Sequence, residues 1–292
     1  MKRFFIVTNL VKDPMQETTG YIKRFLEQRG AVAEVLMRDA ISKHELYESK
    51  ERNPLLVPDD TECILVLGGD GTLLQAARDT LRLDIPLLGI NLGRMGFLAE
   101  VEKGRIDQAL EHLLEDEYEV EDRMLLYGEL VRDGEVVASA HALNDIVTTR
   151  RGPLMVLPFD LCVNEQKLAS YFADGIIVST PTGSTGYNLS AGGPIVNPRA
   201  SLLVVSPICP HTLNTRSIVL SPEDEVSISL GKLQEDKTPL QNAEITFDGS
   251  LSYPVENGDR IRIRKSDRKV RLIRLSSMSF LKVLHEKMRD DE

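Results

Sequence analysis

The chain has 292 residues, of which 42% are hydrophobic and 27% are charged, a balance that indicates a soluble protein of about two domains. Its 45 acidic and 35 basic residues give a formal net charge of −10, which argues against general nucleic-acid binding because that binding needs a basic surface. The apolar runs are too short to span a bilayer, and three scattered cysteines without a CxxC pair favour neither disulfides nor zinc. We expect a cytoplasmic protein that binds no nucleic acid and no membrane.

Residues 1–120 alternate between strand and helix patterns and are predicted to form the first domain. Strand patterns lie at Phe4–Asn9, Ala31–Met37, Cys63–Gly69 and Ile85–Gly93, and helix patterns lie at Gly20–Gly30, directly after Gly71, and at Gly104–Asp116. The polar stretch Arg38–Asp60 contains two prolines and is expected to be a loop or a loose helix. Alternation of this kind predicts an α/β domain, a parallel sheet with helices on both faces.

Residues 121–265 are dense in short strand patterns of alternating polarity, which predict a second, all-β domain. Asp133-Gly134 is a hairpin dipeptide between two alternating runs. Further short strand patterns follow at Arg216–Leu220, Glu225–Leu230, Glu244–Val255, Asp259–Lys265 and Lys269–Leu275. Residues 266–292 are expected to add a strand and a helix that return to the N-terminal domain.

The strongest local signal is the turn Gly68-Gly69-Asp70-Gly71-Thr72, which follows a buried strand pattern and opens a helix pattern. Glycines there let the backbone approach a ligand and aim N–H groups at phosphate oxygens, and the helix N-terminus favours an anion. Asp70 would repel a phosphate, so it fits better as a proton acceptor for an attacking hydroxyl or as a metal ligand. The alternative is a plain N-cap. No Walker A loop, GxGxxG fingerprint, HExxH helix or GxSxG elbow is present.

A second polar turn lies in DGIIVSTPTGSTGYNLSAGG, which spans Asp174–Gly193. It gathers backbone and hydroxyl donors in a small volume, and Tyr187 is able to stack on a base. Asn144-Asp145, at the end of an alternating strand, offers an amide and a carboxylate to sugar hydroxyls. His211 follows a proline in a predicted loop and is a candidate to line a site. Each feature also has a simpler interpretation: the polar segment as an ordinary loop, Asn144-Asp145 as an ordinary turn, and His211 as a structural histidine.

These pieces together resemble the NAD kinase family. The match is ordered along the chain, with GGDGT at Gly68–Thr72, GINLGRMGFLAE at Gly89–Glu100, Asn144-Asp145, the segment Asp174–Pro194, and PICPHTL at Pro207–Leu213. GGDG alone is shared with lipid kinases and phosphofructokinases, whereas TPTGST and the Asn-Asp pair are far more specific. The chain departs from the family pattern at Gly186, where Ala is usual, and at Phe172, where some relatives carry a basic residue.

The resemblance implies that the active site lies in a cleft between the two domains and that the terminal phosphoryl of ATP is transferred to the adenosine-ribose 2′-hydroxyl of NAD, giving NADP. It makes Asp70 the base, and it implies a divalent cation, most simply Mg²⁺, held through the phosphates. The remaining implied contacts are Gly68, Gly69, Gly71 and Thr72 with phosphates, Asn144 and Asp145 with ribose hydroxyls, Thr182, Thr185, Gly186, Tyr187, Asn188, Leu189 and Ser190 with adenine and its neighbours, and Asp174 with the nicotinamide half or a neighbouring subunit's site. The family assembles as homodimers or homotetramers.

Two other functions stay open from the sequence alone. A diacylglycerol or other lipid kinase would share GGDGT, although the acidic balance and the TPTGST block argue against it. A nucleotide sensor without catalysis would use the same glycines, although Asp70 argues for turnover. The choice between ATP and polyphosphate, and between NAD and NADH, is also open.

Overall fold

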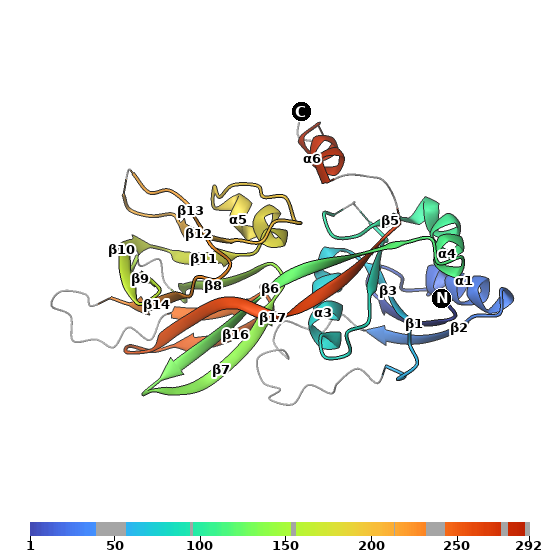
Figure 1. The fold of residues 1–292 in the computed structure, drawn as a ribbon, viewed down its shortest axis with the longest axis horizontal. Coiled ribbons are helices and arrows are strands. Elements are labelled where there is room, and N and C mark those ends of the chain that lie inside the picture. The colour runs from blue at the N-terminus through green and yellow to red at the C-terminus, as the bar shows by residue number, and fades with distance from the viewer. Residues whose placement is uncertain are drawn as a thin grey trace. The chain divides into compact units, whose positions relative to one another are not determined.

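The computed structural model describes residues 1–38, 57–93, 96–152, 156–212, 214–231, 243–275 and 280–289. Most of the predicted loop at Arg38–Asp60 lies outside these residues. The chain divides into two compact units (Figure 1), which we call unit 1 (Met1–Arg123 and Val270–Glu292) and unit 2 (Met124–Lys269). None of the described helices is long and apolar enough to cross a membrane.

Unit 1 is the predicted α/β domain. Its central strands pair in parallel in the order β2-β1-β3-β4. Its strands are β1 (Arg3–Asn9), β2 (Val32–Arg38), β3 (Cys63–Gly68), β4 (Leu87–Asn91) and β5 (Val101–Glu102), and its helices are α1 (Glu17–Gln28), α3 (Asp70–Thr80), the 3-10 turn η1 (Lys103–Arg105), α4 (Ile106–Leu114) and α6 (Phe280–Arg289). The end of β17 (Arg260–Arg274) joins this sheet, where Leu272 pairs in parallel with Leu87 of β4.

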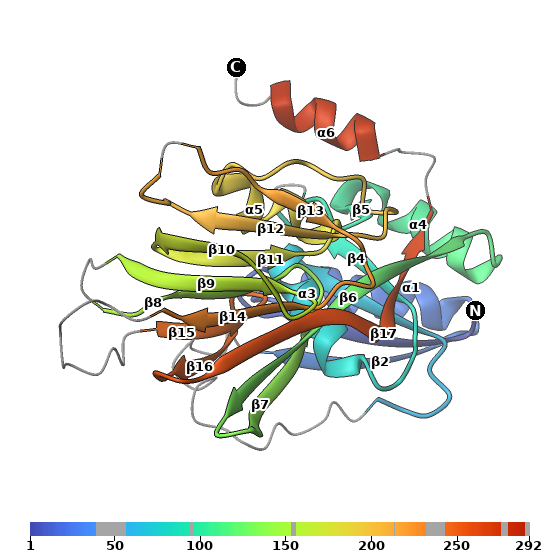
Figure 2. The same cartoon turned by 60° about the vertical axis from the view of Figure 1, so that its left-hand side comes forward.

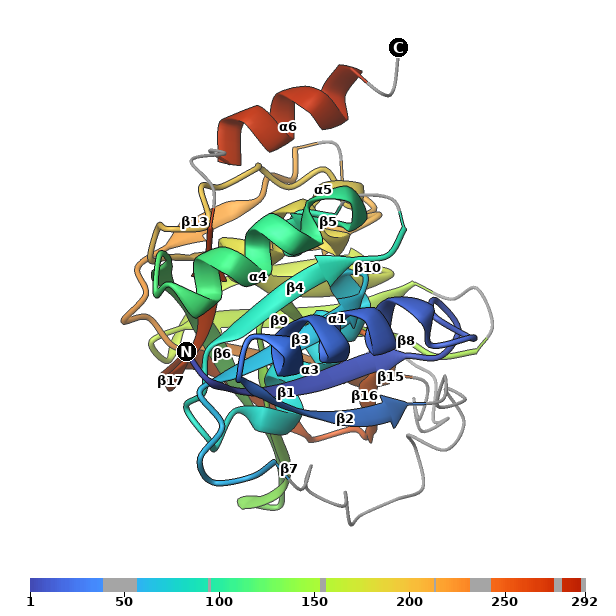
Figure 3. The same ribbon diagram turned by 90° about the vertical axis from the view of Figure 1, so that its right-hand side faces the viewer.

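Helices cover both faces of this sheet, as predicted. Buried residues of α1 and α4, such as Ile22 and Leu110, share one core with alternate strand residues such as Ile6 and Leu65. Figure 3 shows α1 and α4 across the same face. The intervening strand residues point to the other face, where α3 packs against β3 and β4. The alternation of fully buried side chains therefore requires helices on both sides.

Parallel pairing brings the carboxyl ends of three strands to one edge of unit 1. Thr8 of β1 lies beside Leu67 of β3, and Gly68 of β3 lies beside Asn91 of β4. The turn Gly68–Thr72 leaves the sheet at this edge, which is where open α/β sheets bind ligands.

Unit 2 consists almost entirely of antiparallel strands (Figure 2). Its elements are β6 (Glu119–Arg132), β7 (Glu135–Ala142), β8 (Asp145–Arg150), β9 (Leu157–Val163), β10 (Gln166–Ala173), β11 (Gly175–Ser179), the 3-10 turn η2 (Thr182–Thr185), α5 (Tyr187–Ser190), β12 (Leu203–Ile208), β13 (Ile218–Leu220), β14 (Val226–Leu230), β15 (Ala243–Phe247), β16 (Leu251–Val255) and the greater part of β17. The predicted hairpin at Asp133-Gly134 is confirmed, since β6 and β7 pair directly on either side of it.

The core of unit 2 lies between two layers of strands. One layer has the order β13-β12-β11-β8-β15-β16, and the other contains β10-β9-β14-β17 together with β6 and β7. Phe159 and Ile228 from the second layer share one buried cluster with Ile146, Ile176 and Phe247 from the first. The two strands predicted at Asp259–Lys265 and Lys269–Leu275 are in fact one continuous strand of 15 residues, β17. The intervening polar Ser266 is buried rather than turned out into a loop.

Candidate active site

Asp70 is the first residue of α3, and its carboxylate is held by the backbone of a neighbouring loop. Oδ2 accepts the N–H of Phe97 at 2.8 Å, and Oδ1 accepts the N–H groups of Leu98 and Ala99 at 3.3 and 3.4 Å. The N-cap of α3 is Gly69, and no side chain caps this helix. The plain N-cap interpretation of Asp70 is therefore wrong.

Gly96 allows this arrangement, and sequence reasoning missed its role. A Cβ at Gly96 would collide with the Asp70 carboxylate. The loop after β4 approaches the aspartate closely only because residue 96 lacks a side chain. The motif GINLGRMGFLAE carried the signal, but only as a family resemblance. Two of its residues, Arg94 and Met95, lie outside the described residues.

Thr72 is tied to β1 by a contact that the sequence did not reveal. Asn9 Nδ2 donates to Thr72 Oγ1 at 3.1 Å, while Asn9 Oδ1 accepts the N–H of Val11 at 2.9 Å. Asn91, at the end of β4, bonds the backbone of Gly93 in both directions. The amides at the ends of two strands thus fix the loops around the glycine-rich turn.

In unit 2, Asn144 and Asp145 lie at the start of β8 and are packed against the polar turn. Asn144 C=O accepts the N–H of Thr180 at 2.9 Å, and Thr180 Oγ1 donates to Leu143 C=O at 2.6 Å. A Cβ at Gly183 would lie 2.6 Å from the Asn144 Cα, so the TPTGST segment can pack here only with glycine at that position. The side-chain oxygen of Asn144 is buried and accepts no hydrogen bond from the described residues.

Asp145 is buried without a cationic partner among the groups that set its pKa. Burial, together with the negative charge of Asp248, raises the pKa of the Asp145 carboxyl from 3.8 to about 7. Both causes act in the same direction because each disfavours the ionised form. A carboxyl that titrates near neutral pH is typical of functional sites.

The turn that follows β11 divides into exposed and buried candidates. Tyr187 and Leu189 are 45% and 40% exposed, and Ser190 is also exposed. Thr182 is buried, and its backbone C=O accepts the Thr185 hydroxyl. Asn188 is fully buried, where its amide donates to the C=O groups of Ser184 and Pro194 and accepts the Ser206 hydroxyl. Asn188 thus secures the turn from beneath.

Gly186, the position that departs from the family pattern, lies beside the Asn-Asp pair. A Cβ there would be 3.5 Å from Asn144 Nδ2 and 3.8 Å from Asp145 Oδ2. These are ordinary contact distances, whereas the Gly183 C=O at 3.2 Å is tighter. An alanine would therefore touch both side chains, and glycine leaves that space open.

Asp174, Phe172 and His211 gather at the opposite end of β8 and β11. Gly175 pairs with Thr149, and Ser179 pairs with Asp145, so this end lies about 13 Å along the strands from the Asn-Asp pair. Asp174 is paired with Arg150 at 2.9 Å, and the His211 N–H donates to the Phe172 C=O. The pKa of Tyr187 is raised by burial and, to a smaller extent, by nearby negative charges that include Asp174 and Asp145.

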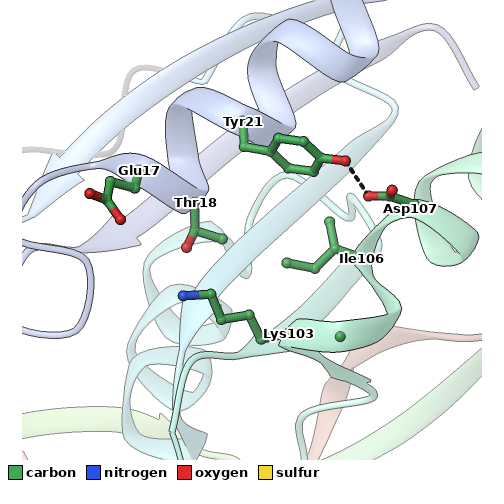
Figure 4. Close-up of a pocket in the computed structure, with 7 residues that line it drawn as sticks. Glu17, Thr18, Tyr21, Lys103, Ile106 and Asp107 are labelled. Carbon is green, nitrogen blue, oxygen red and sulfur yellow. Dashed lines mark hydrogen bonds between the residues drawn. The ribbon is translucent and has the colours of Figure 1, made fainter.

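A separate pocket in unit 1 lies between α1 and the segment around α4, and it contains none of the predicted site residues. Its volume is about 410 Å³. Figure 4 shows Tyr21 donating to Asp107 across it, at 2.6 Å, and the amino group of Lys103 near Thr18. Within the described ranges, no group of three or more His, Cys, Asp or Glu residues is placed to hold a metal ion.

Comparisons with known proteins agree with this arrangement. Residues 4–118 match the family of ATP-NAD kinase N-terminal domains, and residues 143–275 match the family of ATP-NAD kinase C-terminal domains. The chain is 44% identical to an NAD kinase of Lachnospira eligens over 301 residues, covering 99% of this chain and 100% of that protein. It is 42% identical to an NAD kinase of Lachnoclostridium phytofermentans over 292 residues, with coverage of 99% and 100%.

Two solved structures share the fold. One is yeast NADH kinase complexed with NADH, with a TM-score of 0.81, 22% identity, and coverage of 98% of this chain and 87% of that one. The other is an NAD kinase from Archaeoglobus fulgidus in complex with ATP, with a TM-score of 0.73, 24% identity, and coverage of 98% of both chains.

The α/β unit with its glycine-rich turn and the β unit with its hydroxyl-rich turn define the class as a two-domain kinase that acts on a nucleotide. The chain belongs to the NAD kinase family. It is an enzyme that transfers the terminal phosphoryl of ATP to the adenosine-ribose 2′-hydroxyl of NAD and so forms NADP. Of the three functions considered from the sequence, the NAD kinase prediction is confirmed.

Proposed function

We propose that Asp70 is the general base of this reaction and orients the 2′-hydroxyl of NAD. The three backbone N–H groups that it accepts fix both carboxylate oxygens in place. A carboxylate has about four acceptor positions, so capacity remains for one substrate hydroxyl. Its place in the first turn of α3 favours a negative charge, because the helix dipole is positive there.

The phosphates of the nucleotide are proposed to lie along Gly68, Gly69, Gly71 and Thr72. This turn sits at the carboxyl edge of the parallel sheet, and a helix N-terminus favours an anion. The Thr72 N–H itself donates to the Gly69 C=O at 2.9 Å, so Thr72 would meet a phosphate through its hydroxyl. Asn9 holds the Thr72 hydroxyl in position by its hydrogen bond. Phosphoryl transfer depends mainly on this kind of alignment and on neutralising charge.

Mg²⁺ fits as an ion held mainly by phosphate oxygens and water. The described residues provide no cluster of three ligands that would form a protein cage, and Mg²⁺ is usually held by substrate phosphates with one or two carboxylates. When bound, it would neutralise charge on the transferring group. Removal of divalent ions with EDTA should abolish activity, and added Mg²⁺ should restore it.

Asn144 and Asp145 are proposed to hold ribose hydroxyls of NAD. The unpartnered side-chain oxygen of Asn144 supports this role, because a buried acceptor without a donor is costly unless a ligand supplies one. Asp145 supplies a carboxylate next to it. Exposed Tyr187 is proposed to stack on adenine, beside Thr182, Thr185, Gly186, Leu189 and Ser190, while Asn188 supports the turn. Asp174 is proposed to face the nicotinamide half or a second subunit, and Phe172 and His211 are proposed to line the same end of the site.

Two further features belong to the same proposal. The enzyme works in the cytoplasm, and it assembles as a homodimer or homotetramer. Relatives named NAD kinase support the substrate pair, and the yeast and archaeal structures carry NADH and ATP, respectively. A donor screen with ATP, other triphosphates and polyphosphate, followed by sizing of the purified protein, tests these points.

The deciding experiment for the base is Asp70→Asn. The change is nearly isosteric, but its NH₂ group would face a backbone N–H that a carboxylate oxygen accepts, so a modest fall in melting temperature is expected while the fold is kept. Loss of a general base should lower kcat by about 10²–10⁴-fold. NADP formation is followed with an NADP-specific dehydrogenase, and NAD binding is measured by calorimetry. A variant that keeps more than about a third of the wild-type turnover would show that Asp70 is not the base.

A further inference from the structure

The hairpin between β15 and β16 ends in a turn whose aspartate points back into the candidate site. Asp248 and Gly249 both have left-handed backbone angles, with φ of 47° and 61°. The Ser250 N–H donates to the Phe247 C=O at 3.1 Å and closes the turn. Two consecutive left-handed residues form a type I′ turn, for which Asp-Gly and Asn-Gly are the preferred pairs.

The Asp248 carboxylate accepts three consecutive backbone N–H groups of the Asn-Asp segment. Oδ1 accepts those of Asn144 and Asp145 at 2.7 and 3.2 Å, and Oδ2 accepts that of Leu143 at 2.9 Å. In return, the Asp248 N–H donates to the Asp145 C=O at 3.0 Å. Four hydrogen bonds therefore join two segments that lie more than 100 residues apart in the sequence.

The contacts to residues 143–145, rather than the geometry of the turn, explain why residue 248 is an aspartate. Asparagine fits a type I′ turn at least as well as aspartate. Its amide has a single acceptor oxygen, however, and its NH₂ group would face an N–H donor. Only a carboxylate presents two acceptor oxygens to all three N–H groups. The residue type is thus explained by the segment it holds rather than by the turn it forms.

We propose that Asp248 is a positioning residue for NAD: its carboxylate fixes the backbone of residues 143–145, so that the Asn144 amide and the Asp145 carboxylate are presented to the ribose. The inference rests on the proposed role of Asn144 and Asp145. Asp248 is proposed to act through these two residues rather than on the phosphoryl group. Its loss should therefore weaken the use of NAD and leave the use of ATP nearly unchanged.

The same geometry gives a second, independent readout. Among the described residues, the pKa of Asp145 is raised by burial and by the negative charge of Asp248 in the β15–β16 turn, and Asp145 in turn contributes to the raised pKa of Tyr187 of α5, after burial. Removing the Asp248 charge makes ionisation of Asp145 easier. The pH at which the KM for NAD changes should therefore move to lower values in Asp248→Asn.

The chain provides a matched control in the β6–β7 hairpin. Asp133 and Gly134 also have left-handed backbone angles, with φ of 50° and 86°, and Asp133 is exposed. Asp133→Ala and Asp248→Ala place the same residue in the same strained conformation. They differ in the carboxylate contacts to residues 143–145.

The experiment measures kcat and the KM values for NAD and ATP in both alanine variants, in Asp248→Asn and in Asn144→Ala, together with thermal melts. Asp248→Ala should raise the KM for NAD about tenfold, because small misplacement of a positioned group is costly, with the KM for ATP within about twofold of wild type. Asp248→Asn keeps the turn and one acceptor oxygen, so its KM for NAD should lie between those of the wild type and Asp248→Ala. Asp133→Ala should have the KM values of the wild type.

The outcomes separate this inference from the proposal beneath it. If Asn144→Ala raises the KM for NAD and the two Asp248 variants do not, the positioning role is refuted while the role of Asn144 stands. If Asn144→Ala leaves the KM for NAD unchanged, the proposed ribose contact itself fails. Equal rises in both KM values, with an unchanged pH profile in Asp248→Asn, would reduce Asp248 to a purely structural residue. If Asp248→Ala does not fold, the Asp248→Asn measurements decide.

Discussion

Asp145→Asn should make the protein more stable at alkaline pH while it weakens the use of NAD. The pKa of Asp145 rises from 3.8 to about 7 on folding, because of burial and then the Asp248 charge. A raised pKa means that the folded state favours the protonated form. Its stabilising effect is complete below pH 3.8 and is lost as the pH rises through about 7. Asparagine cannot ionise, so the variant avoids this loss.

The expected size follows from the two pKa values. Each unit of difference corresponds to about 1.4 kcal/mol, so ionising Asp145 in the folded protein costs about 4 kcal/mol near pH 8. The same relation gives about 2 kcal/mol near pH 5, where the unfolded chain is already ionised. The advantage of the variant should therefore grow by about 2–3 kcal/mol between these two conditions. With an unfolding entropy of about 2.1 cal/mol/K per residue, this corresponds to about 3–5 °C in melting temperature for a chain of 292 residues.

Scanning calorimetry of the ligand-free protein at both pH values tests this reasoning. Comparing the change between the two conditions cancels any pH-independent effect of the substitution itself. A difference in melting temperature that stays constant, or that shrinks towards alkaline pH, would show that Asp145 is already ionised at low pH in the folded state. The stability argument and the unusual titration of this carboxyl would then both be refuted.

Three further predictions concern other groups. Tyr187→Ala should weaken NAD binding about tenfold by calorimetry and Tyr187→Phe should change it little, since base stacking is worth about 1–3 kcal/mol; lower melting temperature with unchanged affinity would contradict stacking. Replacing all three cysteines should keep kcat and cost stability mainly at buried Cys63, so a folded but inactive protein would reveal a missed role. Burial raises the pKa of Asp259, but the hydrogen bonds and the positive charge of Arg132 outweigh burial, so the pKa is lowered. Asp259→Asn should therefore destabilise the fold at neutral pH, and this effect should disappear in strong acid, where the wild-type carboxylate is also neutral. A loss of melting temperature that is the same at every pH would contradict this prediction.

Local features of this protein could be predicted from the sequence because short-range chemistry determines them. Runs of apolar residues and their spacing located the strands and helices of unit 1, and Asp133-Gly134 located a hairpin. The run from Gly68 to Thr72 located a strand-to-helix turn. In each case the residues that decide the structure are neighbours along the chain.

The same sequence reasoning misjudged features in which distant segments compete. Two separate strands were predicted at Asp259–Lys265 and Lys269–Leu275, yet β17 runs continuously from Arg260 to Arg274. Pairing with β14 in the first part and with β4 in the second keeps the backbone extended through the polar residues between them. Asn188, in the turn predicted to meet a nucleotide, is buried and accepts the Ser206 hydroxyl, a contact that the sequence did not reveal.

The chemical setting of the candidate site was decided by tertiary structure. Nothing in the sequence links Asp70 to the backbone of Phe97, or Asp248 to the backbone of Asn144, because sheet register and loop packing bring these segments together. The pKa of Asp145 depends on the same long-range packing, since a carboxyl titrates according to its burial and the charges that surround it. The sequence by itself determined which residues are candidates for the chemistry, and the fold decided how each is held, because orientation and electrostatics arise from groups far apart in the chain.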